Sequence, residues 1–213
     1  MSRSCFVLLA ILTACGDNRL VPDAAPPKPL PDLTLVGALM EGTIVVTPST
    51  FVATDCEVVE QCVADVGTRR LLRFDTVTAN IGDGDLVVGP PPAKGVSDDT
   101  FMWSPCHGHH HVTGYATYEL RDASGVVVAG HKQSFCLHDV QAVRPEAASN
   151  NYDCSNQGMS AGWADVYSRN LPCQWIDVTG LAGTYTLRVE VNASRRLVER
   201  DTSNNTWSTT VRF

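Results

Sequence analysis

The stretch Tyr115–Ala129 reads YATYELRDASGVVVA, and it indicates the fold more clearly than any other part of the chain. Two runs rich in β-branched and aromatic residues, Tyr115–Leu120 and Val126–Ala129, flank the segment Asp122-Ala-Ser-Gly125. Strand-forming residues on both sides of a short turn that contains Asp and Gly are typical of a β-hairpin. The stretch therefore predicts two antiparallel strands joined at residues 122–125.

The same kind of pattern continues on both sides of this hairpin. Upstream, Thr43–Pro48 is β-branched and ends at a proline, and Leu71–Ala79 alternates between apolar and polar residues. Downstream, Tyr185–Val191 alternates and Thr206–Phe213 forms a last short run, whereas Leu137–Ala161 has no clear period and is predicted to be a long loop. Short strands separated by turn signals predict an all-β fold, a single β-sandwich domain with long loops.

Composition and charge narrow the class of protein. The chain has 213 residues, of which 44% are hydrophobic and 18% are charged, and this balance is typical of a globular protein rather than a disordered one. The formal net charge of -7 argues against a nucleic acid as partner. We therefore expect one folded domain with short additional segments.

The first 31 residues are predicted to lie outside the domain. Residues 1–14 have a positive start at Arg3 and a short apolar run, which together are typical of a signal peptide. The segment Leu12-Thr-Ala-Cys15 resembles a bacterial lipobox, which implies a lipid on Cys15 that anchors the protein without spanning the membrane. Ordinary signal cleavage, with Cys15 incidental, is the alternative. Residues 15–31 form a Pro-rich tether, and residues 32–213 form the domain. We expect export to the bacterial cell envelope, as an outer-membrane lipoprotein.

Export changes the interpretation of the cysteines. Six cysteines follow the predicted leader: Cys56, Cys62, Cys106, Cys136, Cys154 and Cys173. An even number in an oxidising compartment predicts three disulfides, although the sequence alone allows 15 pairings.

The segment Cys106-His-Gly-His-His-His111 is the densest chemical signal in the chain. On a strand, successive side chains point to opposite faces, so His107, His109 and His111 would share one face and His110 would point away. Three imidazoles on one face are suited to a single copper, zinc, iron or nickel ion. A surface histidine tract is the alternative, and the spacing does not identify the metal.

Several motifs resemble the lysyl oxidase family. The histidine segment is followed by Gly130-His-Lys-Gln-Ser-Phe-Cys-Leu-His-Asp139, and later by Gln157–Gly162 and Cys173-Gln-Trp-Ile-Asp177. The likeness also includes Pro31-Asp-Leu33, Arg70–Phe74 and Glu199–Asn205. It therefore extends in order over nearly all of residues 31–213.

This resemblance implies a role for particular residues. It implies that His107, His109 and His111 bind copper, and that Lys132 and Tyr167 together form the cofactor lysyl tyrosylquinone. It also implies that Asp165, two residues before that tyrosine, is a candidate catalytic base. Apart from the resemblance, Lys132 would be an ordinary surface lysine, Tyr167 a packing residue and Asp165 a turn cap.

The implied activity is that of a copper-dependent amine oxidase similar to protein-lysine 6-oxidase. Such an enzyme uses O2 to convert primary amines, including peptidyl lysine, to aldehydes, and it releases hydrogen peroxide and ammonia. A copper- or zinc-binding envelope lipoprotein without a mature quinone is the alternative.

The resemblance also implies structural features. It implies the disulfides Cys56–Cys62 and Cys106–Cys154, and we infer that Cys136 pairs with Cys173 because their near partners in the animal enzymes are absent. Hard oxygen ligands near both ends of the domain imply a calcium site, whose members are Asp32, Leu33, Glu199, Asp201, Asn204 and Asn205. An Asx-rich turn without an ion is the alternative.

Overall fold

The computed structural model describes residues 28–147 and 150–213, apart from the side chains of residues 131–134. The predicted signal peptide, Cys15 and most of the predicted tether lie outside the described residues. Within the described residues, no helix has the length and apolar character needed to cross a membrane.

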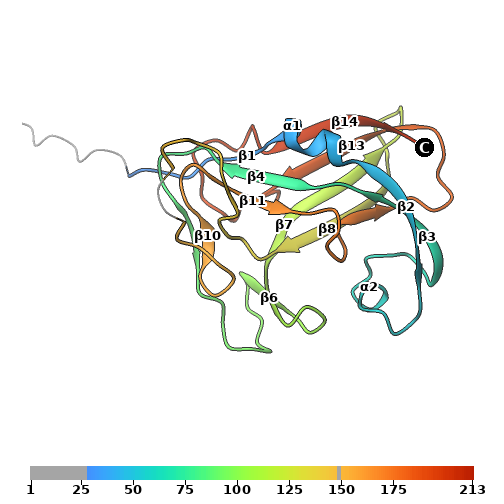
Figure 1. Ribbon diagram of the computed structural model, residues 1–213, viewed down its shortest axis with the longest axis horizontal. Helices are drawn as coiled ribbons and strands as arrows, with labels where there is room; N and C mark the ends of the chain where they lie inside the picture. Colours follow the sequence, from blue (N-terminus) through green and yellow to red (C-terminus); the bar gives the residue numbers. More distant parts are fainter. Residues whose placement is uncertain (1–27, 148–149) are drawn as a thin grey trace, which may run out of the picture.

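The described chain is all-β, as predicted, with only short helical turns between strands (Figure 1). In chain order the elements are β1 (Leu33–Leu35), α1 (Gly37–Met40), the 3-10 turn η1 (Glu41–Thr43), β2 (Val45–Phe51), α2 (Cys56–Val59), β3 (Gly67–Arg73), β4 (Thr76–Asn80), β5 (Leu86–Gly89), β6 (Phe101–Ser104), β7 (His109–Arg121), β8 (Val127–Phe135), β9 (Gln141–Ala142), β10 (Gln157–Met159), β11 (Trp163–Tyr167), β12 (Trp175–Asp177), β13 (Thr184–Val191) and β14 (Thr206–Arg212).

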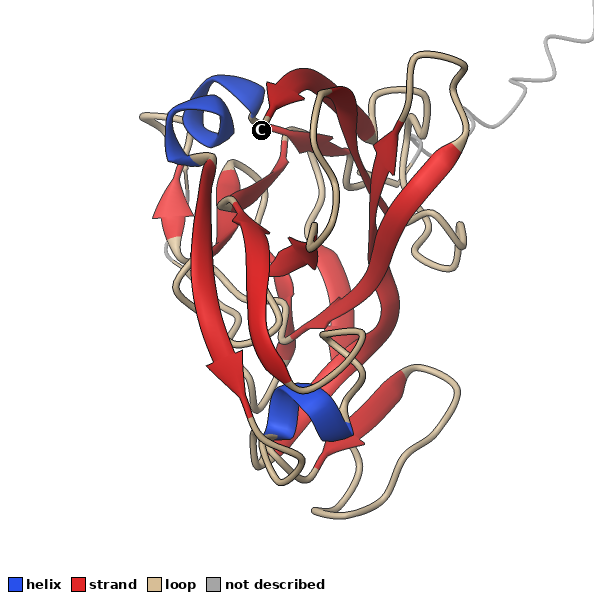
Figure 2. Ribbon diagram, turned by 90° about the vertical axis from the view of Figure 1, so that its right-hand side faces the viewer, coloured by secondary structure: helices blue, strands red, loops and turns tan. Residues whose placement is uncertain are grey.

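Two antiparallel sheets form the sandwich. Figure 2 shows strands on both sides of the interior, with the short helices near the top and the bottom of the view. One sheet has the strand order β1-β4-β11-β9, and the other is built around β7, which pairs with β13, β6 and β8, while β14 pairs with β13. Leu33, Val77 and Ala164 from the first sheet share one buried cluster with Tyr118 and Leu187 from the second. This common core confirms the predicted sandwich.

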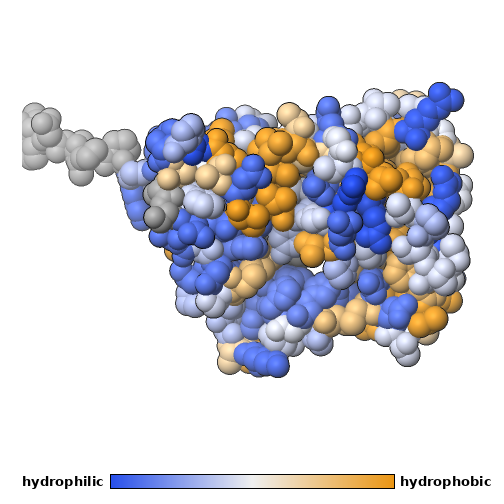
Figure 3. Space-filling view, in the orientation of Figure 1, coloured by the Kyte–Doolittle hydropathy of each residue, from blue (hydrophilic) through white to orange (hydrophobic). Residues whose placement is uncertain are grey.

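Alternation along β13 shows why this sequence forms a sandwich strand. Leu187 and Val189 are fully buried, whereas Arg188 and Glu190 between them face outward and form an ion pair of 2.7 Å. Successive side chains on a strand point to opposite faces, so one face enters the core and the other meets water. Polar and apolar side chains are interspersed over the face shown in Figure 3, as is usual for a protein surface.

A smaller sheet, with the order β12-β3-β2, corrects two sequence predictions. The alternating run Leu71–Ala79 is not one strand, because it divides between β3 in this sheet and β4 in the sandwich. The chain crosses between them at Asp75, whose backbone N–H donates to the Thr43 hydroxyl and whose carboxylate accepts the backbone N–H of Arg169. Strand β2 also continues through Pro48, which is tolerated because β2 lies at the edge of its sheet.

The long loop predicted at Leu137–Ala161 is largely irregular, but it contains two short strands. Strand β9 extends the first sandwich sheet beside β11, and β10 pairs with β5 in a separate two-stranded sheet. Asp139 organises the loop, since its carboxylate accepts hydrogen bonds from Asn151 and from the backbone and side chain of Ser160. These contacts hold the two ends of the loop against each other.

The six cysteines form three disulfides, as predicted, but every predicted pairing is wrong. The predicted pairs were Cys56–Cys62, Cys106–Cys154 and Cys136–Cys173. The observed pairs are Cys56–Cys106, Cys62–Cys173 and Cys136–Cys154.

The short helix α2 separates Cys56 from Cys62 and so explains why they do not pair with each other. Its first residue is Cys56, and the turn that follows ends at Cys62, which lies in a second buried cluster with Cys173 and Trp175. The Trp175 indole N–H donates to the carbonyl of Cys62 at 2.9 Å. Cys62 is thereby fixed in the small core, while Cys56 pairs with the segment before the histidines.

Candidate metal centre

The three histidines predicted as ligands lie at the turn between β6 and β7. Residues Ser104 and His109 face each other at the turn end of this hairpin, so the intervening residues form a tight turn. The Ser104 hydroxyl accepts the backbone N–H of His107, and Gly108 has a φ of 70°, in the left-handed region that favours glycine. His107 is therefore in a turn and not on a strand as predicted, and only His109 and His111 alternate on β7.

The turn nevertheless brings the three rings together. Nε2 of His111 lies 2.9 Å from Nε2 of His109 and 3.4 Å from Nδ1 of His107, and the three rings offer nitrogens that all lie within 4.8 Å of one another. Nitrogens bound to one metal at about 2.0–2.1 Å lie roughly 3 Å apart. The cluster therefore has the dimensions of a three-histidine metal site.

The electrostatic environment keeps the rings of His109 and His111 neutral. Burial, followed by the neighbouring histidines, lowers the pKa of His111 to about 3, and burial also lowers the pKa of His109. A neutral imidazole has the free lone pair that a metal requires. The Nδ1–H of His109 is directed at the carbonyl of His107, 3.1 Å away, which leaves its Nε2 facing the cluster.

His110 points away from the cluster. Its Nε2–H donates to the carbonyl of Val96 at 2.8 Å, and its ring packs edge-on against Trp103 with centroids 4.9 Å apart. This neighbour of the cluster therefore contributes to packing on the opposite side of β7.

Tyr167 and Asp165 lie on the same side of strand β11. The Tyr167 hydroxyl accepts the backbone N–H of Cys136 at 2.6 Å, and its ring packs against Phe135 with centroids 3.6 Å apart. Burial, with the nearby Asp165 as the next cause, raises the pKa of the Tyr167 phenol. Its partly buried position therefore favours the neutral form of the phenol.

Asp165 is buried without the partners that a carboxylate usually has. The residue is 1% exposed, and neither carboxylate oxygen has a hydrogen-bond partner among the described residues. Nε2 of His138 lies 3.8 Å from Oδ1, which is too far for a hydrogen bond. Burial raises the pKa of Asp165 well above its usual value, and the charge of Asp139 adds to this effect.

Lys132 lies in β8, where its backbone is paired with Thr117 of β7. Its side chain lies outside the described residues. The structure therefore places the strand that carries Lys132 in the same sandwich as β11, but it gives no position for the amine.

One cavity of about 390 Å³ joins the histidines to the tyrosine. It is lined by His107, His109, His111, Cys136, His138, Cys154, Val166, Tyr167, Leu171 and Pro172. Sequence reasoning missed His138, although it stands in the motif Gly130–Asp139, because a lone histidine in a loop gives no indication of what it faces. It also missed Glu60, whose carboxylate lies 3.5 Å from Nε2 of His107.

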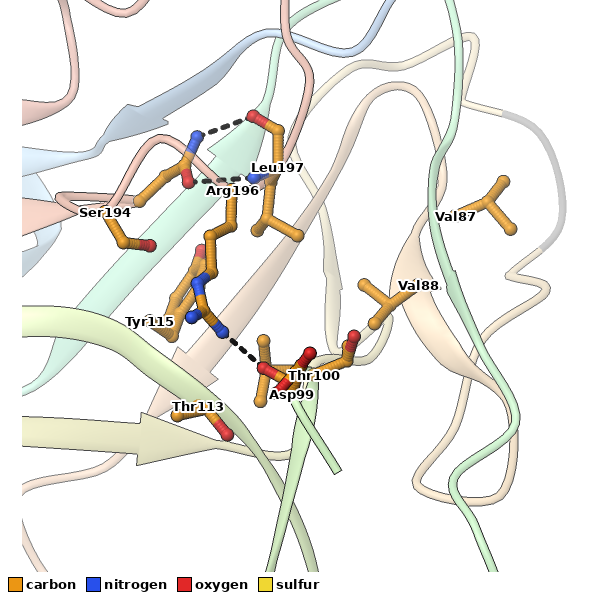
Figure 4. A pocket seen from close by; sticks show the side chains of 11 residues that line it. Val87, Val88, Asp99, Thr100, Thr113, Tyr115, Ser194, Arg196 and Leu197 are labelled. Carbon is orange, nitrogen blue, oxygen red and sulfur yellow. Dashed lines mark hydrogen bonds between the residues drawn. The ribbon is translucent and has the colours of Figure 1, made fainter. Parts of the chain in front are cut away.

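A second cavity, of about 210 Å³, is shown in Figure 4. Tyr115, Thr113 and Val88 are among its lining residues, and Arg196 crosses it to donate to the carbonyl of Asp99. None of the residues predicted to bind copper or form the quinone lines this cavity. The cavity beside the histidines is therefore the candidate site.

Five of the six residues predicted to bind calcium lie together near the start of β1. Asp32 accepts the amide N–H of Asn204 at 2.8 Å and forms an ion pair of 2.6 Å with Arg200. Glu199 accepts from the backbone N–H of Leu33 at 2.9 Å and from the amide of Asn205 at 2.7 Å. These contacts connect the two ends of the domain through protein groups alone.

Asp201 lies apart from this cluster, and the amides of Asn204 and Asn205 have hydrogen-bond partners for their nitrogens but not for their oxygens. Asp201 is exposed and accepts the backbone N–H of Ser203 within its own turn. The side-chain carbonyl oxygens of Asn204 and Asn205 are buried and have no hydrogen-bond partner among the described residues. Two buried amide oxygens beside two carboxylates are a donor set suited to a hard cation.

Comparison with known proteins finds one matching family model and several related sequences. The family model described as lysyl oxidase matches residues 33–213. Lysyl oxidase homolog 3 from Homo sapiens is 35% identical over 188 residues, which cover 82% of this chain and 24% of that protein. Lysyl oxidase homolog 2 from Xenopus tropicalis is 32% identical over 212 residues, which cover 93% of this chain and 27% of that protein. The chain thus spans about a quarter of the length of these curated relatives.

Proposed function

Because this chain belongs to the lysyl oxidase family, we propose that it is a copper-dependent amine oxidase whose cofactor, lysyl tyrosylquinone, forms from its own Lys132 and Tyr167. The observation that carries this proposal is the shared cavity. The three-histidine cluster and Tyr167 line the same space, so a metal held by the histidines would be near the phenol that is to be oxidised.

His107, His109 and His111 would hold the copper ion. Imidazole is a good ligand for copper, and three protein ligands leave positions open for water or oxygen. The separations of 2.9 and 3.4 Å between ring nitrogens and the neutral state of His109 and His111 support this role. Together, copper and the quinone would supply the oxidation RCH2NH2 + O2 + H2O → RCHO + NH3 + H2O2.

Asp165 is the candidate base for the proton lost from the carbon next to the amine. Burial raises the pKa of this carboxyl, and a base with a pKa nearer neutrality accepts a carbon-bound proton more effectively than an ordinary aspartate. Asp165 does not itself line the cavity. His138 does, and its Nε2 lies 3.8 Å from Oδ1 of Asp165, so this histidine stands between the carboxyl and the cavity.

The cavity wall suits a primary amine on an alkyl chain. Val166, Leu171 and Pro172 provide apolar surface in the wall of the cavity. An alkyl chain gains free energy when it leaves water for such a surface. We therefore propose primary amines, including lysine side chains of proteins, as substrates, with O2 as the co-substrate.

The decisive test is a covalent bond between Lys132 and Tyr167. The full chain is loaded with copper in air and digested, and we expect mass spectrometry to find one crosslinked species that contains both residues, together with amine-dependent release of peroxide. Tyr167→Phe should abolish the crosslink and the peroxide. Tyr185→Phe is the matched control, since the Tyr185 hydroxyl donates to Ala182 and does not line the cavity.

Separate peptides and no peroxide, in a protein that still binds metal through its histidines, would contradict the proposed activity. They would instead support the alternative, a copper- or zinc-binding envelope lipoprotein without a mature quinone. Imidazole ligands suit zinc as well as copper, so metal binding alone does not decide between the two.

We also propose a calcium ion at the contact between the two ends of the domain. The amides of Asn204 and Asn205 direct their nitrogens at Asp32 and Glu199, and their oxygens are left without partners. The two ends of an amide are assigned from their contacts, and half a turn of each amide would direct its oxygen toward the carboxylates. A cation between these oxygens would stabilise that arrangement.

The predicted leader leads to a proposal about location. We propose that the protein is exported to the bacterial envelope and held at the outer membrane by lipid on Cys15. A Cys15→Ser variant should lose fatty-acid labelling and leave the membrane fraction. Retention of both properties in the variant would contradict the lipid anchor.

A further inference from the structure

Glu60 lies beside the histidine cluster at the end of helix α2. Its Oε1 accepts the hydroxyl proton of Ser104 at 2.6 Å, and its Oε2 lies 3.5 Å from Nε2 of His107. Oε2 is also 3.9 Å from the sulfur of Cys173, but that sulfur is in a disulfide and has no proton to donate. The two polar neighbours of this carboxylate are therefore Ser104, the last residue of β6, and His107 in the turn that follows.

Two disulfides fix Glu60 from both sides. Cys56, at the start of α2, is bonded to Cys106, which directly precedes His107 in the chain. Cys62, two residues after Glu60, is bonded to Cys173. The backbone N–H of Glu60 donates to Cys56 at 2.7 Å, so the carboxylate has little freedom to move away from the histidine turn.

The backbone next to Glu60 carries a further sign of constraint. Gln61 has a φ of 61°, in the left-handed region that residues other than glycine rarely adopt. Such a conformation persists where the surrounding structure requires it. Here the disulfide at Cys62 is the adjacent constraint, and the conformation of Gln61 turns the chain from Glu60 to that bond.

His107 has a nitrogen that needs the acceptor that Glu60 offers. Its Nδ1 faces His111 at 3.4 Å, so this is the nitrogen with which it would bind a metal. The proton is then on Nε2, which is buried and makes no hydrogen bond among the described residues. Glu60 is the carboxylate beside it, and a small rotation of either side chain would close the separation of 3.5 Å to a hydrogen bond.

Ser104 links the two residues a second time. Its hydroxyl accepts the backbone N–H of His107 at 3.1 Å and donates its own proton to Glu60. The serine therefore orients the carboxylate and the histidine turn relative to each other. For His109, the nitrogen that faces away from the cluster has a backbone acceptor, because its Nδ1–H is directed at the carbonyl of His107.

We propose that Glu60 is a positioning residue of the metal centre. It accepts the Nε2 proton of His107 and so keeps the Nδ1 lone pair directed at the position between His109 and His111. The disulfides Cys56–Cys106 and Cys62–Cys173 hold the carboxylate in place. This inference rests on the proposed metal centre, and loss of such an outer carboxylate typically weakens metal binding about 10- to 100-fold.

The test is the affinity of the full chain for Cu(II), measured by competition with a chromophoric chelator after the metal has been removed. We expect Glu60→Gln to raise the dissociation constant by about 10- to 100-fold, and to change the electron paramagnetic resonance spectrum of bound Cu(II). The control is Glu57→Gln, which removes a carboxylate from the same helix and should leave both measurements unchanged, because Glu57 has Arg73 as its charged neighbour.

Each outcome has a distinct meaning. An unchanged affinity for Glu60→Gln, together with lost binding for His109→Ala, would overturn the role of Glu60 and leave the metal centre intact. Unchanged affinity for both variants would contradict the metal centre itself. Should Glu60→Gln fail to fold, Ser104→Ala removes the hydrogen bond that orients Glu60, and we expect weaker Cu(II) binding for it too. Wild-type affinity of Ser104→Ala would then overturn the proposal.

Discussion

Removal of the disulfide Cys62–Cys173 should lower stability strongly, because this bond joins residues 111 positions apart. Closing so long a loop in the unfolded chain corresponds to about 4–5 kcal/mol in the chain-entropy model, and the other two disulfides shorten the loop and bring this to about 4 kcal/mol. For a domain of this size, each kcal/mol shifts the melting temperature by roughly 2–4 °C. We therefore expect a Cys62→Ala, Cys173→Ala variant to melt roughly 8–16 °C below the unaltered protein.

Two measurements on the same variant test this prediction. Thermal unfolding followed by circular dichroism gives the change in melting temperature. Titration of free thiols under denaturing, non-reducing conditions gives the connectivity, with the unaltered protein as reference for Cys5 and Cys15. In the structure the other two disulfides do not involve Cys62 or Cys173, so the variant should gain no thiol.

The pairing predicted from the sequence gives a different result. It would leave Cys56 and Cys136 without partners, and the variant would show two new thiols. That result would refute the connectivity described here. No new thiol together with an unchanged melting temperature would instead refute the estimate based on loop closure.

Three further predictions concern buried groups. Because burial raises the pKa of Asp165, the folded protein holds this proton more tightly than the unfolded chain. The resulting stability is complete below the unfolded pKa of about 3.9 and is lost as the pH rises toward the folded pKa. Asp165→Asn should therefore raise the melting temperature at pH 7, and the increase should become smaller toward pH 4. The same variant should oxidise amines more slowly. A lower melting temperature at pH 7 would show that the carboxylate has a stabilising partner. Removal of calcium with a selective chelator should lower the melting temperature of the unaltered protein but not of Asn204→Ala, and equal shifts would argue against an ion there. Gly37→Ala would place a Cβ in steric overlap with the Trp207 ring, so calorimetry should show a loss of about 1–3 kcal/mol in the free energy of unfolding, and no loss would mean that the indole moves freely.

The fold was predictable because the pattern that specifies it is local. On β13 the alternation of Leu187 and Val189 with Arg188 and Glu190 is a property of neighbouring residues, and the structure buries one set and exposes the other. The hairpin of β7 and β8 was equally readable, since a turn rich in Asp and Gly lies between two β-branched runs. The run Leu71–Ala79 misled because alternation does not reveal that the chain changes sheets at Asp75.

The candidate site was predictable only in part. Sequence spacing singled out His107, His109 and His111, and the rings do converge, although a turn and not a strand places His107. The roles given to Tyr167 and Asp165 came from family resemblance, since neither residue stands in a pattern with a chemical meaning of its own. The structure adds that Asp165 is buried and Tyr167 partly buried on one side of β11, and this loss of contact with water is the main cause of their altered pKa values.

The sequence by itself determined which residue types are present and how the backbone period distributes them between two faces. It therefore determined the all-β class, the number of disulfides and the spacing of the histidines. The tertiary structure decided which distant segments meet: the partners of all six cysteines, and the contact of Glu60 with His107. The physical reason is that a disulfide or a hydrogen bond depends on distance and direction in space, which are set by the packing of whole sheets and not by neighbours in the chain.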